Sequence, residues 1–204
     1  REMAALVATG EQVSAALLSL ALQQLDIKAI SLTGVQAGIH TTNRYTKANI
    51  VNIDREKILS WLPTHVPIVT GYQGANSVNE LTTLGRGGSD LTAIAIAHVI
   101  DARECQIYTD VLGVYSADPR IVPTAKLLQT IYYPEMLALA SCGSKVLQLQ
   151  AVEFGIRYGI PLRVLSSTAT GRGTQVLPIK FNNSVTEIVG LAYQPEQLVF
   201  EIEP

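Results

Sequence analysis

The chain has 204 residues, of which 48% are hydrophobic and 16% are charged, and its formal net charge at pH 7 is −2. A chain of this length forms one domain, or one domain with part of a second, and it can bury a substantial core. The high apolar content argues against intrinsic disorder, and the near-neutral charge argues against a nucleic-acid-binding surface.

Targeting signals and cysteines indicate the compartment. The sequence has no uninterrupted apolar run of the roughly twenty residues that a membrane-spanning helix needs, and its N-terminus has no signal-peptide pattern. Cys105 and Cys142 lie in apolar segments without metal-ligand spacing, which predicts buried, reduced thiols. We therefore expect a cytoplasmic protein, or a plastid protein after transit-peptide removal, without a membrane partner.

The first half of the chain alternates helical and strand-like segments. It begins Arg1-Glu2-Met3, without an initiator Met at position one, which indicates the interior of a longer protein. Apolar spacing predicts a first helix over residues 12–25. The next elements predicted are a strand over 29–32, a loop over 34–43, a strand over 48–53, a helix over 55–62 and a strand over 66–70.

The alternation continues in the second half. The predicted elements are a helix over 91–100, a strand over 106–109, a polar loop to 126, helices over 134–140 and from about 145 to 158, a strand over 161–165, a turn at 171–174 and two short strands within 185–202. This order predicts an α/β fold in three αβα layers with a mostly parallel central sheet. In such folds ligands bind at the carboxyl ends of the strands.

The most informative segment is the loop Thr82-Thr83-Leu84-Gly85-Arg86-Gly87-Gly88-Ser89-Asp90. Its glycines let backbone N–H groups approach an anion, Ser89 can cap the helix that follows, and the helix dipole favours negative charge there. The loop therefore predicts an anion site that contains a guanidinium. A glycine-rich loop before a helix can also be a plain turn.

A second motif lies about fifteen residues beyond this loop. It reads Cys105-Gln106-Ile107-Tyr108-Thr109-Asp110-Val111, then Gly113-Val114-Tyr115-Ser116-Ala117-Asp118-Pro119-Arg120. Together the two motifs resemble the aspartate kinase branch of the amino acid kinase family. The resemblance extends over residues 8–14, 140–147 and 151–154. It implies the amino acid kinase fold, with a catalytic domain over 1–180 and the start of an ACT-type regulatory domain over 181–204.

The resemblance also implies an activity. Family members of this branch transfer the γ-phosphate of ATP, with Mg²⁺, to the β-carboxylate of L-aspartate, and the product 4-phospho-L-aspartate leads to lysine, threonine and methionine. ATP and L-aspartate are thus the expected partners, with no nucleic acid. The parent protein is expected to form a homo-oligomer through its regulatory domains. No protein side chain is assigned as a metal ligand.

The resemblance implies a substrate-binding set: Glu11, Tyr72, Arg86, Gly87, Gly88 and Ser89. Arg86 can bind the α-carboxylate through a bidentate pair, although a surface ion pair is the alternative. Glu11, in a turn expected to open the first helix, is assigned to the α-ammonium; a helix-capping carboxylate is the alternative. Tyr72 can line the pocket or only pack in the core.

Two residues carry the implied catalysis, Asp90 and Lys145. Asp90, in the first turn of its helix, is expected to organise lysines around the transferred phosphoryl group. Lys145 is expected at a helix start, where a cation is electrostatically disfavoured and a function is therefore indicated. The implied ATP-binding set is Thr109, Asp110, Tyr115, Asp118, Arg120, Lys145 and Val146. Asp118 can alternatively brace its turn.

The sequence departs from the family pattern at two places. Val146-Leu147-Gln148-Leu149-Gln150 stands where Val-Leu-His-Pro-Arg is common, and no Lys-Phe-Gly-Gly segment occurs in the 204 residues. The second departure predicts that this chain alone is poorly soluble or catalytically inactive. The alternatives are a kinase for glutamate, acetylglutamate or UMP, and a non-catalytic nucleotide-binding or amino-acid-binding fragment. An arginine in the loop favours a substrate with a free α-carboxylate.

Overall fold

The computed structural model describes residues 1–178 and 188–193. The chain divides into two compact units, residues 1–105 and 106–204. The division falls inside a strand, β7 (Cys105–Thr109), whose neighbours in the sheet belong to the second unit.

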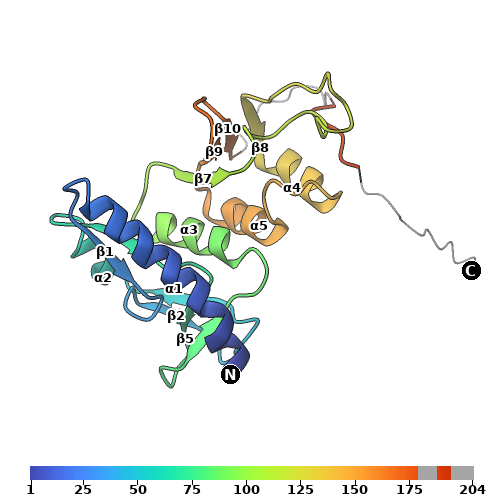
Figure 1. The fold of residues 1–204 in the computed structure, drawn as a ribbon. Coiled ribbons are helices and arrows are strands. Elements are labelled where there is room, and N and C mark those ends of the chain that lie inside the picture. The colour runs from blue at the N-terminus through green and yellow to red at the C-terminus, as the bar shows by residue number, and fades with distance from the viewer. Residues whose placement is uncertain (179–187, 194–204) are drawn as a thin grey trace, which may run out of the picture. The chain divides into compact units, whose positions relative to one another are not determined.

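The first unit contains two sheets and three helices (Figure 1). Its elements are α1 (Glu2–Gln23), β1 (Ala29–Leu32), β2 (Ile39–Thr41), β3 (Ile50–Ile53), α2 (Arg55–Leu59), β4 (Val66–Val69), β5 (Gln73–Ala75), β6 (Leu81–Thr83) and α3 (Gly88–Val99). Strands β1 and β4 pair in parallel, with Ala29 opposite Val66. The other sheet has the order β3-β2-β5-β6.

Helix α1 packs on the strands through small residues. Its buried residues are Ala4, Ala8, Ala15 and Ser19, which recur at intervals of four and seven and so share one face. The predicted start at residue 12 is wrong, because the helix begins ten residues earlier. Residues 2–8 are mostly strong helix formers, and Gly10 costs only about 1 kcal/mol relative to alanine.

Among the described residues, α1 is also the one helix long and apolar enough to cross a membrane by length and composition. Core helices of soluble proteins and signal sequences pass the same test. Glu11 and Gln12 interrupt its apolar residues, so the helix contains no uninterrupted apolar run of the length expected for a membrane span. Helix α1 is therefore unusually apolar, and its length and composition alone do not assign it to a bilayer.

The second unit has one four-stranded sheet, in the order β7-β9-β10-β8. Its other elements are β8 (Thr130–Tyr132), α4 (Tyr133–Ser141), α5 (Leu149–Tyr158), β9 (Leu162–Ser166) and β10 (Thr174–Leu177). The buried residues of the strands alternate along the chain, as Leu162 and Val164 do in β9. Tyr133 and Met136 of α4 are also buried, and the Tyr133 hydroxyl donates to the Ile160 carbonyl.

The α/β class agrees with the prediction, whereas the detail of the sheets is less regular. Pairs β1/β4, β2/β5 and β8/β10 are parallel, while β2/β3, β5/β6 and β9/β10 are antiparallel. The prediction missed β2, β5, β6, β8 and β10. Each is only three or four residues long, too short to show a clear alternation of apolar residues.

The remaining predictions concern the cysteines and the C-terminal segment. Cys105 is buried as predicted, but Cys142 is exposed, because it follows the last residue of α4 at a surface turn. Most of the segment expected to form regulatory-domain strands lies outside the described residues. Residues 188–193 are described and contain no strand. The boundary predicted at residue 180 stays a prediction.

Candidate active site

The glycine-rich loop connects β6 to α3 in the first unit. Gly85 and Gly87 have φ angles of 84° and 74°, which residues with a side chain rarely adopt. The loop folds back onto the segment that follows β4, because the Leu84 N–H donates to the Tyr72 carbonyl over 2.9 Å. The motif therefore lies at the carboxyl end of β4, the edge predicted for ligand binding.

Small residues let the first turn of α3 lie against this strand end. A Cβ atom at Gly88 would lie 2.9 Å from Cδ2 of Tyr72, and one at Gly71 would lie 3.1 Å from Cα of Ser89. The Tyr72 N–H donates to Oγ1 of Thr92 over 3.1 Å. The structure thus brings together three residues of the predicted substrate-binding set, Tyr72, Gly88 and Ser89; their binding roles stay predictions.

Arg86 lies in the middle of this loop and is exposed. It forms no ion pair with any residue in the part of the chain that the structure describes. Among the described residues, Arg86 therefore does not form the surface ion pair that was its alternative interpretation. Its five N–H groups can donate hydrogen bonds to an external carboxylate.

The helix start differs from the prediction at Ser89. The N-cap is Gly87, with no side-chain hydrogen bond, and α3 begins at Gly88. Gly87 takes the cap position because its left-handed conformation ends the loop, which places Ser89 one residue inside the helix. Asp90 lies in the first turn, as predicted, where the helix dipole favours a carboxylate.

The charge of Asp90 also acts on a buried thiol. Burial, followed by the charges of Asp90 and Glu104, raises the pKa of Cys105 to about 11. A thiol with such a pKa stays protonated at neutral pH and is a poor nucleophile. Cys105 is therefore a buried, protonated thiol close to Asp90. Its burial and its free state agree with the predicted reduced structural cysteine.

Glu11 does not lie in a turn. It is half-buried near the middle of α1, because the helix continues through Gly10. The neighbouring Gln12 donates from Nε2 to Oε1 of Gln73 over 3.1 Å, and Gln73 donates from Nε2 to the Ala8 carbonyl over 3.2 Å. Gln73 has no exposed surface and follows Tyr72, so these bonds fix α1 to the strand beside the predicted pocket.

Thr70 is a residue of this strand end that sequence analysis missed. It follows the last residue of β4 and is only 3% exposed. Its Oγ1 is the one buried side-chain polar atom of the described residues without a hydrogen-bond partner. Such an atom costs about 1–3 kcal/mol. The available signal was a polar residue ending an apolar strand directly before Gly71 and Tyr72.

The second motif occupies the carboxyl end of β7 in the second unit. Thr109 Oγ1 donates to Oδ1 of Asp110 over 3.0 Å, and the Thr109 carbonyl accepts from the N–H and the Oγ of Ser167. Tyr115 then pairs with Leu127 in an isolated antiparallel bridge. Gly113 allows the turn, because a Cβ atom there would lie 2.6 Å from Oγ1 of Thr174.

Asp118 and Arg120 form a bidentate ion pair. Nε of Arg120 donates to Oδ1 over 3.0 Å and Nη2 donates to Oδ2 over 2.7 Å, while the Arg120 backbone N–H also donates to Oδ1. These bonds, with a smaller contribution from the charge of Lys145, lower the pKa of Asp118 to about 2. Asp118 thus braces its turn, and its role in binding ATP stays a prediction.

Lys145 and Val146 lie in the connection between α4 and α5. The prediction of a helix from about residue 145 is wrong, because α5 begins at Leu149 after an N-cap at Gln148 with extended angles. Leu147 is buried and anchors the connection, so the chain turns into the helix only after it. Lys145 is exposed and lies close enough to Asp118 for its charge to lower that pKa.

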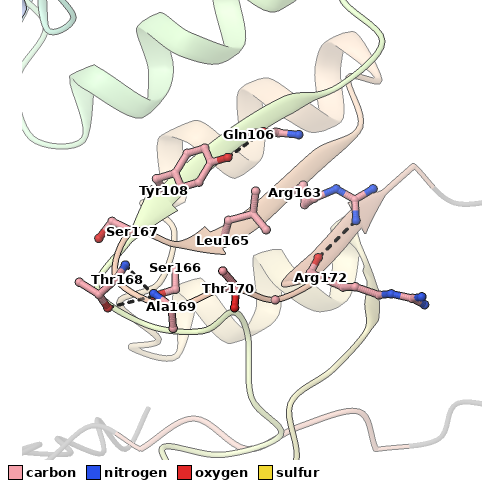
Figure 2. A pocket seen from close by; sticks show the side chains of 11 residues that line it. Gln106, Tyr108, Arg163, Leu165, Ser166, Ser167, Thr168, Ala169, Thr170 and Arg172 are labelled. Carbon is pink, nitrogen blue, oxygen red and sulfur yellow. Dashed lines mark hydrogen bonds between the residues drawn. The ribbon is translucent and has the colours of Figure 1, made fainter. Parts of the chain in front are cut away.

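A cavity of about 630 Å³ lies beside the second motif (Figure 2). It is lined by Gln106, Tyr108, Arg163, Leu165, Ser166, Ser167, Thr168, Ala169, Thr170, Gly171 and Arg172. Figure 2 shows the Arg163 guanidinium directed at the Arg172 carbonyl, 3.3 Å from Nη1. None of the predicted ATP-binding residues lines the cavity, although Ser167 holds the Thr109 carbonyl.

Family comparison defines the class of protein. The chain belongs to the amino acid kinase family, whose model matches residues 1–166. This match confirms the resemblance to the family that the two motifs indicated.

Within this family, the similar relatives reported below are aspartate kinases. The chain is 48% identical over 200 residues to the aspartate kinase of Pseudomonas fluorescens (strain SBW25), covering 97% of this chain and 48% of the relative. It is 51% identical over 177 residues to the aspartokinase of Geobacillus stearothermophilus, covering 86% of this chain and 44% of the relative. The chain therefore spans about half the length of the curated relatives it matches.

Solved structures give the same result for the fold. The aspartate kinase from Synechocystis has a TM-score of 0.76 and 46% identity, covering 90% of this chain and 30% of that chain. E. coli aspartokinase III in complex with aspartate and ADP has a TM-score of 0.78 and 32% identity, with coverages of 88% and 41%. A UMP kinase from Ureaplasma parvum, at 18% identity and a TM-score of 0.58, shares the fold alone.

Proposed function

We propose that this chain is the catalytic part of an aspartate kinase, which transfers the γ-phosphate of Mg-ATP to the β-carboxylate of L-aspartate. One structural observation supports an amino-acid substrate over UMP. Arg86 is exposed and has no ionic partner among the described residues, in a loop shaped by glycines at the start of a helix. This geometry suits a free α-carboxylate, which UMP lacks.

The substrate is held by the first unit in this proposal. Arg86 binds the α-carboxylate, while the amides of Gly87 and Gly88 and the Ser89 hydroxyl face the β-carboxylate. Glu11 accepts from the α-ammonium and Tyr72 lines the pocket. Aspartate is the amino acid in the complex of E. coli aspartokinase III, a similar structure.

The nucleotide is held by the second unit. Thr109, Asp110 and Tyr115 contact the nucleotide, and Lys145, Val146 and the Asp118–Arg120 pair lie towards its phosphates. Asp90 organises lysines around the transferred phosphoryl group, and Lys145 offsets the negative charge that moves during phosphoryl transfer. Such a reaction depends mainly on positioning and charge neutralisation.

Mg²⁺ fits this site only together with ATP. In the described residues, no group of three or more His, Cys, Asp or Glu side chains could hold a metal ion. Protein-bound Mg²⁺ commonly uses one or two carboxylates plus substrate phosphates, and Asp110 and Asp118 are the carboxylates of the second motif. The ion would supply charge neutralisation for the phosphates.

The proposal extends to the biological setting of the longer protein. We infer that its product enters the synthesis of lysine, threonine and methionine, in the cytoplasm or in a plastid. We also infer a homo-oligomer that forms through regulatory domains. None of these inferences depends on the roles of individual side chains.

The test is aspartate-dependent turnover. We expect a chain extended by an N-terminal Lys-Phe-Gly-Gly segment to release ADP with aspartate and to form a product that hydroxylamine traps as a hydroxamate. The 204-residue chain should turn over about 10²–10³-fold more slowly, the usual effect of one missing preorganised donor. Equal activity of the extended chain with glutamate, acetylglutamate or UMP would favour another kinase of the family. ATP binding by the extended chain without any turnover would favour a binding module.

A further inference from the structure

The loop between β2 and β3 lies beside the glycine-rich loop of the first unit. We call it loop 42–49, after its residues. The Ala48 N–H donates to the Thr83 carbonyl over 2.9 Å, and the Thr83 N–H donates to the Tyr45 carbonyl over 2.7 Å. Thr83 is the last residue of β6, which is the edge strand of its sheet. Loop 42–49 therefore covers this edge directly before the chain enters the glycine-rich loop.

Lys47 is the side chain of loop 42–49 that lies against Gly85. A Cβ atom at Gly85 would lie 3.9 Å from Cγ of Lys47 and 3.6 Å from the Thr46 carbonyl oxygen. The side of Gly85 that carries no side chain therefore faces Lys47. Arg86 is the next residue, and the Lys47 ammonium lies three bonds beyond Cγ on a flexible stem. The ammonium can thus reach a ligand that the Arg86 guanidinium binds.

A hydrogen-bonded tyrosine fixes loop 42–49 in this place. The Tyr45 hydroxyl donates to Oε2 of Glu80 over 2.6 Å, and Oε1 of Glu80 lies 3.1 Å from Nε of Arg1. The hydrogen bond lowers the pKa of Glu80 and raises the pKa of Tyr45, so the carboxylate accepts from the phenol at neutral pH. Both oxygens of Glu80 therefore have partners other than Lys47.

The positive charge of the two loops is not balanced by acidic residues of the same loops. Neither residues 42–49 nor residues 84–89 include Asp or Glu. Lys47 and Arg86 are exposed, and neither forms an ion pair with any residue among 1–178 and 188–193. Two neighbouring cations repel each other, and an anion bound between them offsets this repulsion. The pair therefore favours a negatively charged ligand more strongly than Arg86 alone.

We propose that Lys47 is a further substrate-binding residue, whose ammonium attracts the anionic amino acid that Arg86 binds. The inference rests on the proposed function, because the anion is the aspartate of that site. Arg86 supplies a directional bidentate pair, whereas Lys47 acts as a flexible point charge. Lys47 therefore raises the affinity for aspartate and takes no part in the transfer of the phosphoryl group.

The first test is the dissociation constant of aspartate in the chain extended by the Lys-Phe-Gly-Gly segment. It is measured by isothermal titration calorimetry with a non-hydrolysable ATP analogue present. Lys47→Met, which keeps an unbranched stem but removes the charge, should weaken aspartate binding by about fivefold at low salt, the upper end for an exposed charge pair. Lys47→Arg should restore the affinity, and kinetics should show the loss in KM for aspartate rather than in kcat.

Salt separates an effect of charge from an effect of structure. Exposed charges are screened within about 30 Å at 10 mM salt and within about 3 Å at 1 M. The ratio of the dissociation constants of Lys47→Met and the wild type should therefore fall towards one between these salt concentrations. A structural disturbance of the glycine-rich loop would leave the ratio unchanged.

Lys28→Met is the matched control. Lys28 is exposed and belongs to the same unit, but it precedes β1, which runs parallel to β4. It therefore lies at the amino ends of these strands, opposite the edge where Thr70 and the glycine-rich loop lie. The affinity of Lys28→Met for aspartate should equal that of the wild type at every salt concentration.

The outcomes distinguish this inference from the proposed function. If the wild type does not bind aspartate, the proposed function fails, and the role of Lys47 fails with it. If the wild type binds aspartate and Lys47→Met binds it equally tightly at low salt, only the role of Lys47 is wrong. A loss that does not depend on salt, or an equal loss in Lys28→Met, would also overturn that role.

Discussion

The two motif loops contain the same kind of side chain in opposite states. Arg86 of the first unit is exposed and has no ionic partner among the described residues, whereas Arg120 of the second unit is held by both carboxylate oxygens of Asp118. An arginine that has no internal partner can accept a ligand carboxylate directly. One that is already paired must exchange its partner, or it serves the loop rather than the ligand.

The largest effect should come from removing the unpaired guanidinium. In the extended enzyme, Arg86→Ala should weaken the affinity for aspartate by an amount equivalent to about 2–5 kcal/mol, typical of losing a buried charge partner. ATP binding should change little. The measurement is steady-state kinetics with each substrate varied in turn.

Arg86→Lys is the control for this experiment, because it keeps the charge but loses the bidentate geometry. The affinity of Arg86→Lys for aspartate should lie between that of the wild type and that of Arg86→Ala. If the affinities for aspartate and for ATP fall equally, the loop has misfolded and the assigned role of Arg86 is wrong.

The second effect concerns Asp90, which shares the loop with Arg86 but should act on turnover. Asp90→Asn should keep substrate affinities within a few fold and lower kcat by on the order of 10². Asn keeps the size of the side chain at the first turn of α3, so a loss of folding is not expected. Unchanged turnover would remove Asp90 from the mechanism.

A third and smaller effect should occur at Thr70, at the strand end beside the Arg86 loop. Thr70→Val removes a buried hydroxyl that has no hydrogen-bond partner, so the free enzyme should gain about 1 kcal/mol of unfolding free energy. Thermal unfolding with and without aspartate measures it. If Val instead destabilises the free enzyme, the hydroxyl has a partner in solution that compensates its burial.

The contrast between the loops also shows what sequence can predict. The glycines of the first loop and the position of Asp90 follow from local chemistry, because positive φ angles and a helix start are decided within a few residues. The pairing of Asp118 with Arg120 is local as well; the sequence analysis allowed Asp118 to brace its turn but did not identify Arg120 as its partner.

Other features could not be predicted, because they depend on contacts between distant residues. The Gln12–Gln73 hydrogen bond joins residues 61 positions apart, and the short strand β5 exists through its pairing with β2 and β6. The position of Lys145 outside a helix depends on the burial of Leu147. No pattern within the local sequence encodes any of the three.

The smallest effect is the titration of Asp118, and it tests the paired state of Arg120 directly. The pKa of this carboxyl in the folded chain is about 2, below its ordinary value of 3.8, chiefly because Arg120 donates to it. Since the folded-state pKa is lowered, the pair favours the ordered turn above pH 3.8, and this contribution is lost as the pH falls through about 2. Between pH 5 and pH 9, roughly where both pKa values have been passed, Asp118 stays ionised and should therefore cause no change of ATP affinity with pH.

Arg120→Ala should return the pKa of Asp118 towards 3.8, as measured by carboxyl-carbon NMR. Arg172→Ala is the control with another arginine of the second unit. A pKa of Asp118 that stays near 2 in Arg120→Ala would show that another group holds the carboxylate, and the contrast with Arg86 would then lose its basis.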